Sequence, residues 1–217
     1  MKFTELFPLI TYINLDSRQD RDRLAKKEFE KLSISPTRIS GTVVNVSNNK
    51  MANGVLGCTL SHVKCLEMAL GQNQNIFIFE DDIKLVDSSF QTIDKCFEEL
   101  SKMDWDMLYL GGNVLKPIYQ KTEHVGKLTH CQSTVAYGVN KNFLKKLISY
   151  IPRNQIIPID LVYTNQAIPN NDCFISIPMA IVQRDSFSDI EGKQVQYESY
   201  LQKRYDANLV YLEKGAC

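Results

Sequence analysis

The sequence predicts an α/β sandwich in which helices cover a mostly parallel central sheet. Short apolar, β-branched runs alternate with amphipathic segments along the chain, and polar residues directly follow several of those runs. The 217 residues contain no internal repeat and no recognisable linker. We therefore expect one domain over residues 1–217, with a polar tail, 194–217, at its periphery.

The first predicted elements are a strand, a helix and a second strand. Leu9–Leu15 is apolar and β-branched, which favours a buried strand. Asp16 or Ser17 can cap the next helix, Arg18–Leu32, and the many charges of that helix place it at the surface. A Ser-Pro pair ends the helix, and Thr37–Val46 is expected to carry the second strand.

A helix and a central strand are predicted next. Asn45–Asn53 is polar and is expected to form a loop, after which Thr59 or Ser61 can cap a helix that runs through Leu70. Apolar residues at helical spacing give this helix a buried face. Ile76–Phe79 is a short run of β-branched and aromatic residues, which is typical of a central strand.

The remaining pattern continues the alternation of helices and strands. A helix over Ser88–Met103 has the clearest apolar face in the chain. The other expected elements are the strands Met107–Leu110 and Thr134–Val139, a helix from Asn140 to Ile151, and a final strand pair, Phe174–Ile177 and Met179–Val182.

Composition excludes some classes of protein. Lys and Arg total 25, as do Asp and Glu, so the net charge of zero argues against a nucleic-acid partner. No apolar stretch is long enough for a membrane span, and the N-terminal residues do not resemble a signal peptide. The six cysteines are scattered and are expected to be buried free thiols. We expect a cytoplasmic protein, bacterial or, if viral, in the host cytosol or virion.

Three consecutive carboxylates follow the predicted central strand. Glu80, Asp81 and Asp82 would stand at its carboxyl end, where open α/β sheets bind ligands. Adjacent like charges repel each other, and a divalent cation that also bridges diphosphate oxygens would relieve the repulsion. This pattern predicts a Mg²⁺ or Mn²⁺ site for a nucleotide diphosphate. A solvated loop after a strand explains the pattern equally well.

A second polar cluster lies between the first strand and the first helix. Asn14 or Asp16 could hydrogen-bond a base or a ribose, and Arg18 or Arg21 could contact phosphate with two nitrogens. Helix capping and a solvated charged face are the competing interpretation, and on these residues alone it is favoured.

The segment from Gly57 to His62 is the third candidate. A glycine before a helix lets a ligand approach the backbone, and Ser61 and His62 would lie in a first turn that favours anions. The three histidines are not spaced for a zinc site. A nucleophile pair of Cys58 with His62 has no third group to complete it.

Two single aspartates complete the set of candidates. Asp160 lies in an apolar segment bounded by proline, where a carboxylate near a pocket could act as a general base or could cap a turn. Asp189 follows a Ser-Phe-Ser run and could complete a metal shell.

Taken in order, these motifs resemble those of glycosyltransferase family 25. The matching segments are Tyr12–Asp16 with Arg18, Asp20 and Arg21; Gly57–His62; Phe79–Ile83; Asp104–Gly111; Pro158–Asp160; and Ser188–Glu191. The resemblance implies a GT-A-like, Rossmann-related three-layer sandwich. It also implies an inverting hexosyltransferase that uses UDP-galactose or UDP-glucose with Mn²⁺ or Mg²⁺. The acceptor would be a glycan or a hydroxylated protein, and the tail could lie on the acceptor side.

The resemblance also implies roles for individual residues. Asp81 and Asp82 would hold the metal, with Glu80 beside them and Asp189 as a further ligand. Asn14, Asp16, Arg18 and Arg21 would border the nucleotide, and Ser61 and His62 would line the donor pocket. Asp160 would be the base.

Two other classes of function remain open. Relatives of the collagen type often continue the Pro-x-Asp motif with Glu, whereas Leu161 follows Asp160 here. A catalytically inactive glycan- or nucleotide-binding module on the same fold would account for that difference. A metal-dependent phosphotransferase is the third hypothesis, but the chain has no P-loop motif.

Overall fold

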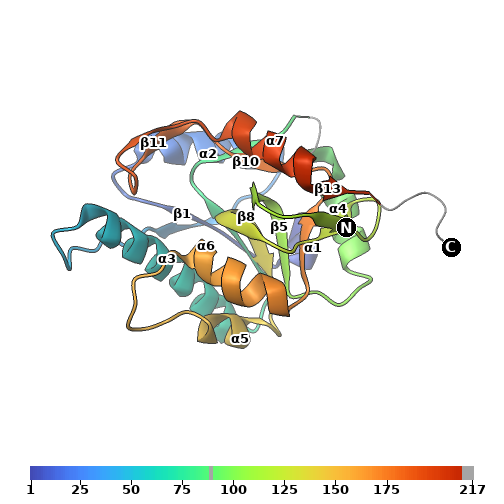
Figure 1. Ribbon diagram of the computed structural model, residues 1–217, viewed down its shortest axis with the longest axis horizontal. Coiled ribbons are helices and arrows are strands. Elements are labelled where there is room, and N and C mark those ends of the chain that lie inside the picture. Colours follow the sequence, from blue (N-terminus) through green and yellow to red (C-terminus); the bar gives the residue numbers. More distant parts are fainter. Residues whose placement is uncertain (88–89, 212–217) are drawn as a thin grey trace.

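A computed structural model describes residues 1–87 and 90–211 (Figure 1). Within these residues, a nine-stranded sheet has the order β13-β6-β7-β9-β5-β8-β3-β1-β2. Strands β7 and β8 run against the other seven strands. The strands are β1 (Leu9–Asn14), β2 (Thr37–Ser40), β3 (Ile76–Glu80), β5 (Met107–Val114), β6 (Ile118–Gln120), β7 (Val125–Lys127), β8 (Cys131–Val139), β9 (Cys173–Ser176) and β13 (Leu209–Val210).

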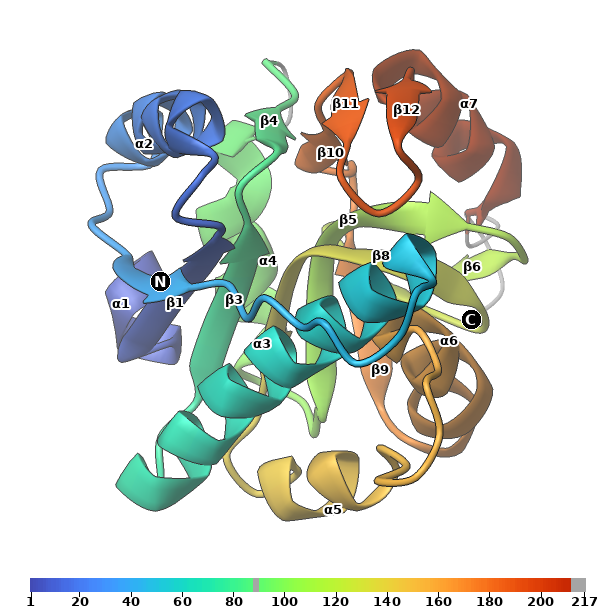
Figure 2. The same cartoon turned by 90° about the vertical axis from the view of Figure 1, so that its left-hand side faces the viewer.

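Helices cover both faces of the sheet, as Figures 1 and 2 show. One apolar layer contains side chains from α1 (Phe3–Leu6), α2 (Gln19–Lys31) and α4 (Ile93–Leu100). The opposite layer contains side chains from α3 (Lys50–Gln72), α5 (Leu144–Ser149) and α6 (Ile159–Val162). Leu201 and Tyr205 of α7 (Glu198–Asn208) join the same apolar cluster, although Figure 1 shows this helix on the side of the sheet where α2 lies. The predicted GT-A-like three-layer α/β sandwich is thus confirmed.

Strand β3 shows why the sheet needs cover on both faces. Ile76 and Ile78 belong to the layer with α3, whereas Phe77 and Phe79 belong to the layer with α1. Successive side chains of a strand point to opposite faces, so an uninterrupted apolar run is stable only between two helical layers. Because this strand is buried, the carboxylates at its carboxyl end lie at the edge of the apolar core.

Two small sheets extend from the main sheet near these carboxylates. The strands β4 (Ile83–Leu85) and β10 (Ile181–Gln183) pair antiparallel, and β11 (Ser186–Ser188) pairs with β12 (Lys193–Val195) in a hairpin. Figure 2 shows the hairpin beside β10 and α7. We call residues 186–195 the hairpin.

Most predicted elements are confirmed to within a few residues, but two expectations were wrong. The third helix begins at Lys50, with Asn49 as its cap, so the expected loop Asn45–Asn53 ends early. The expected strand pair near Pro178 does not form, because β9 lies in the main sheet and β10 pairs with β4. The tail, for which no element was predicted, contributes most of β12 together with α7 and β13.

Two expectations fall partly outside the described residues. The predicted helix Ser88–Met103 begins at a residue that the structure does not describe. Its described part begins with a short 3-10 turn at Phe90. Among the described cysteines, Cys65, Cys96, Cys131 and Cys173 are buried free thiols and Cys58 is half-buried, while Cys217 lies outside. No helix among the described residues is both long and apolar enough to cross a membrane.

Gly111 provides a test of how β10 crosses the main sheet. A Cβ atom at Gly111 would lie 1.8 Å from the carbonyl oxygen of Ile181, a backbone atom that cannot rotate away. Gly111→Ala should therefore lower the free energy of unfolding by about 3 kcal/mol, the upper end of ordinary overpacking costs. Urea denaturation measures this change. Gly71→Ala is the control, because a Cβ there meets nothing within 4 Å, and an unchanged or raised stability is expected. Equal stability of the two variants would contradict the packing described here.

Candidate functional site

The acidic turn, Glu80-Asp81-Asp82, lies where β3 leaves the sheet. Asp81 and Asp82 are buried, with exposed fractions of 8% and 3%. Carboxylates this deeply buried require compensating charge or hydrogen bonds. Helix α2 supplies a compensating charge, because Arg21 Nη1 lies 2.8 Å from Asp81 Oδ1 and 3.2 Å from Asp82 Oδ2.

Neighbouring side chains hold the two aspartates in place. Asn14, at the end of β1, donates from Nδ2 to Asp81 Oδ2 at 2.8 Å. Gln183, at the end of β10, donates from Nε2 to Asp82 Oδ2 at 3.0 Å. The amide of Arg184 donates to the backbone carbonyl of Asp82 at 2.6 Å. The parallel strands thus bring the first and third strand ends together, as predicted for the carboxyl edge of an α/β sheet.

Two polar atoms in this cluster are buried without a hydrogen-bond partner among the described residues: Oδ1 of Asp82 and Nε of Arg21. Native proteins pair nearly all such atoms, so an acceptor and a donor left without partners on two residues that contact each other indicate a ligand site. Burial and, next, the negative charge of Glu80 raise the pKa of Asp82 well above its usual range. A cation at Oδ1 would offset both effects, so the residues present fit a metal ion.

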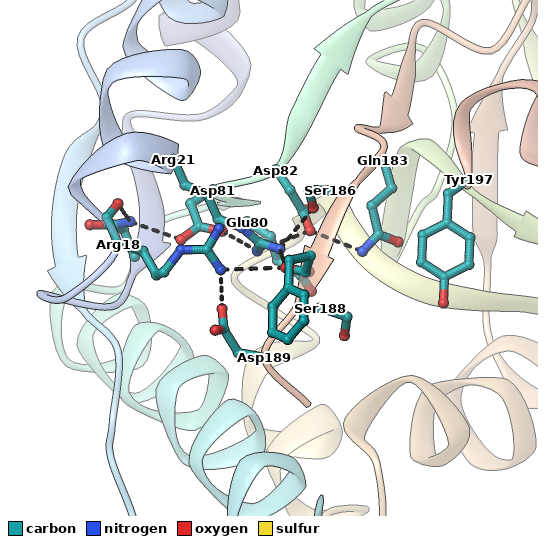
Figure 3. A network of polar contacts seen from close by, with 12 residues as sticks. Arg18, Arg21, Glu80, Asp81, Asp82, Gln183, Ser186, Ser188, Asp189 and Tyr197 are labelled. Atoms are coloured by element: carbon teal, nitrogen blue, oxygen red, sulfur yellow. Dashed lines mark hydrogen bonds and ion pairs between the residues drawn. The ribbon is translucent and has the colours of Figure 1, made fainter. Parts of the chain in front are cut away.

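Arg18 and Arg21 also contact the hairpin, and Arg21 connects it to the acidic turn (Figure 3). Arg21 Nη2 donates to Ser186 Oγ at 2.9 Å and to the carbonyl of Phe187 at 2.8 Å. Arg18 forms an ion pair with Asp189. Asp189 therefore pairs with an arginine, and among the described residues Asp81, Asp82 and Asp189 do not form a compact group of three ligand atoms.

The predicted nucleotide-binding residues do not all line one cavity. Arg21 lines the cavity described next, whereas Asn14, Asp16 and Arg18 are not part of its wall. Asn14 is buried behind Asp81 and accepts hydrogen bonds from Arg38 at its Oδ1. Asp16 is exposed and pairs with Arg38 at 2.7 Å. These contacts order the end of β1 beneath the site.

A cavity of about 540 Å³ opens over the acidic turn, and we call it the larger cavity. Its wall includes apolar side chains such as Ile13, Leu15 and Val44, and it also includes Arg21 and the three acidic residues of the turn. The predicted residues Ser61 and His62 line it as well. An apolar wall with a few convergent charges is typical of small-molecule sites.

Ser61 and His62 reach this cavity from a different position in the helix than predicted. The prediction placed them in a first turn, but α3 begins at Lys50, so their backbone N–H groups are used within the helix. Ser61 Oγ instead accepts from Thr42 N at 2.8 Å. Gly57 is explained by packing, since a Cβ there would lie 2.4 Å from the Thr42 carbonyl oxygen.

A second cavity, of about 310 Å³, adjoins the first, and we call it the smaller cavity. Both cavities share five lining residues: Cys58, Glu80, Gln183, Ser188 and Ile190. Asp160 lines the smaller cavity, together with Ser133 and Thr134 from β8 and Tyr197 beside α7. Asp160 Oδ2 accepts from Ser133 N at 3.1 Å, and Oδ1 accepts from Leu161 N at 2.8 Å.

Several residues of these cavities were missed by the sequence interpretation. Gln183 contacts Asp82, Thr134 Oγ1 donates to Glu80 Oε1 at 2.5 Å, and Tyr197 donates to Glu191. None of them stands in a motif. The positions of Gln183 and Tyr197 depend on the β4–β10 pairing and on α7, neither of which was predicted, so the sequence held no signal for them.

The acidic turn and Arg21 lie at the carboxyl edge of an α/β sandwich, where such sheets bind ligands, and comparison with known proteins assigns the class. Residues 8–146 match the sequence model of Glycosyltransferase family 25 (LPS biosynthesis protein). This match covers well over half of the chain, so the chain belongs to that family.

Named relatives agree with the family. Over 190 residues the chain is 24% identical to Procollagen galactosyltransferase 1-B of Xenopus laevis, which covers 74% of the chain and 30% of the relative. Over 170 residues it is 28% identical to the Procollagen lysyl hydroxylase and glycosyltransferase of Acanthamoeba polyphaga mimivirus, covering 67% and 19%. The chain thus spans less than a third of the length of these relatives.

Solved structures were compared as well. A197 from STIV aligns over 86% of this chain and 92% of its own length, with a TM-score of 0.49 and 15% identity. A glycosyltransferase involved in glycosylation of the major capsid of PBCV-1 covers 92% and 100%, with a TM-score of 0.44 and 11% identity. Both TM-scores are below 0.5 and add nothing to the assignment.

The buried ion pair predicts a large effect of Arg21 on stability. Arg21→Met leaves two buried carboxylates without their cation, and breaking such a pair costs roughly 3 kcal/mol or more. Chemical denaturation measures the loss. Arg23→Met, an exposed arginine on the same helix, is the control and should change stability little. Adding Asp82→Asn to Arg21→Met should recover part of the loss, and a double variant no more stable than Arg21→Met would refute the electrostatic explanation.

Proposed function

We propose that this chain transfers a hexose from UDP-galactose or UDP-glucose to a hydroxyl group of a glycan or hydroxylated protein, with inversion and with Mn²⁺ or Mg²⁺. The observation that carries the proposal is that two buried atoms, Asp82 Oδ1 and Arg21 Nε, have no hydrogen-bond partner among the described residues, while both residues line the larger cavity. We call it the donor cavity from here on, and we call the smaller one the acceptor cavity. A free acceptor and a free donor on two residues in contact match a ligand that combines a cation with phosphate oxygens. The names of the two procollagen-modifying relatives support the transfer of a galactosyl group to a collagen-like acceptor.

In this proposal the donor cavity holds the nucleotide-sugar. Asp82 would hold the ion, with Asp81 next to it, and the ion would supply charge neutralisation for the departing diphosphate. Arg21 already contacts both aspartates, and its Nε has no hydrogen-bond partner among the described residues. This arginine would orient the diphosphate while the apolar wall near Ile13 and Leu15 covers the nucleoside.

The acceptor cavity would bring the attacking hydroxyl to the opposite side of the sugar. Inversion is a single displacement: the acceptor oxygen forms a bond to the anomeric carbon as the bond from that carbon to the phosphate oxygen breaks. Asp160 would take the proton of the hydroxyl group. The backbone N–H groups of Ser133 and Leu161 hold the carboxylate in place. The shared residues Glu80 and Gln183 mark where the two substrates would meet.

Calorimetry with UDP tests the donor half of the proposal. UDP should bind the protein more tightly with Mn²⁺ than without it, by at least about tenfold, or about 1.4 kcal/mol. Asp82→Asn keeps the shape of the side chain but removes the charge, so the metal-dependent gain should disappear. GDP and CMP serve as comparison ligands. Equal UDP affinity with and without metal, or an unchanged gain in Asp82→Asn, would refute the metal assignment.

Asp160→Asn tests the acceptor half. Loss of a general base typically lowers the rate about 10²–10⁴-fold, and the turnover number for transfer should fall by that factor. UDP affinity should stay at the wild-type value, because Asp160 lies in the other cavity. Asp206→Asn, at an exposed position on α7, is the matched control. Wild-type turnover in Asp160→Asn would exclude it as the base. A wild-type protein that binds UDP but transfers and hydrolyses nothing would instead identify a binding module.

A further inference from the structure

Three potential metal ligands of different chemistry meet beneath the junction of the two cavities. Cys58 and His62 are four residues apart on one face of α3, and Glu80 comes from the end of β3. Their ligand atoms all lie within 4.8 Å of one another. Cys58 and Glu80 line both cavities, and His62 lines the donor cavity.

The histidine of this group has one nitrogen held by a tyrosine and one that faces Glu80. Its side chain is 1% exposed, and Nδ1 hydrogen-bonds the Tyr137 hydroxyl at 2.9 Å. Tyr137 in turn contacts the Tyr163 hydroxyl at 3.2 Å. Nε2 is buried without a hydrogen-bond partner among the described residues, and it lies 3.3 Å from Glu80 Oε1. A histidine whose second nitrogen is held by a hydrogen bond is the usual arrangement at a metal site.

We propose that Cys58 Sγ, His62 Nε2 and Glu80 Oε1 form a second metal site, which takes a borderline ion such as Zn²⁺ or Co²⁺. A sulfur, nitrogen and oxygen set suits these ions, whereas the oxygen-only set at Asp81 and Asp82 suits Mg²⁺ and Mn²⁺. Binding displaces the proton of the Cys58 thiol to solvent, and the thiolate becomes the ligand. This proposal does not depend on the proposed transfer reaction.

Another cluster offers a comparison within the same structure. Glu99, Glu123 and His124 also bring three ligand atoms within 4.8 Å of one another. There, however, the Glu99 oxygens already accept hydrogen bonds from Thr122 Oγ1 and from the amide of His124, and Glu99 also pairs with His124 Nδ1. Both oxygens of Glu99 are thus engaged by hydrogen bonds, whereas His62 Nε2 makes an ion-pair contact with Glu80 Oε1 and has no hydrogen bond among the described residues.

The position of the proposed site gives it a consequence for ligand binding. Three protein ligands leave one coordination position of a tetrahedral ion open, as at catalytic zinc sites. Because Cys58 and Glu80 line both cavities, that open position would face the place where the cavities join. An ion there would engage Glu80, which Thr134 otherwise holds.

Titration of the full chain with Co²⁺ tests the site, because thiolate ligation to Co²⁺ gives a charge-transfer absorption band that oxygen ligands do not give. Wild type should develop the band at one equivalent of Co²⁺, and Zn²⁺ should displace the ion and remove the band. Cys58→Ser should abolish the band. His62→Gln should weaken Co²⁺ binding by about tenfold or more.

Two controls make the result decisive. Cys217→Ser should keep the band, which excludes the thiol of the tail. If Cys58→Ser fails to fold, mass spectrometry of wild type provides the second measurement, since Zn²⁺ should protect Cys58 from alkylation in preference to the other cysteines. A wild type without the band, a band that survives Cys58→Ser in a folded protein, or alkylation of Cys58 that Zn²⁺ does not change would each overturn the proposal.

Discussion

The buried contact between Arg21 and the two aspartates of the acidic turn organises the rest of the site. Three consecutive carboxylates at the end of a buried strand repel one another, and two of them are almost inaccessible to water. One guanidinium group offsets that charge and also holds the hairpin through Ser186 and the Phe187 carbonyl. The positions of helix α2, strand β3 and the hairpin therefore depend on the guanidinium group of Arg21.

The same contacts explain why the buried carboxylates are stable before a ligand binds. Arg21 supplies positive charge to the turn, yet its Nε and the Oδ1 of Asp82 remain unpaired. In the proposed complex an added ion would satisfy the carboxylate oxygen and a phosphate oxygen would satisfy the guanidinium group. A buried ion pair contributes little net stability, so part of its interaction energy is available to a ligand.

The sequence predicted the parts of this account that depend on local pattern. Apolar runs identified the strands, and Glu80-Asp81-Asp82 was placed correctly at a strand end beside Arg21. It could not predict where the third helix begins, because the polar residues before Lys50 carry no apolar periodicity. Contacts between distant segments were also out of reach: Gln183 meets Asp82 only because β10 pairs with β4, and Glu80 joins Cys58 and His62 only after folding.

A crystal structure with UDP and Mn²⁺, with the metal located by anomalous scattering, tests the central claim most directly. The account predicts a manganese peak at bonding distance from Asp82 Oδ1, with Arg21 Nε directed at a phosphate oxygen of UDP. A manganese peak away from Asp82, or a UDP diphosphate that touches neither Asp82-bound metal nor Arg21, would contradict it.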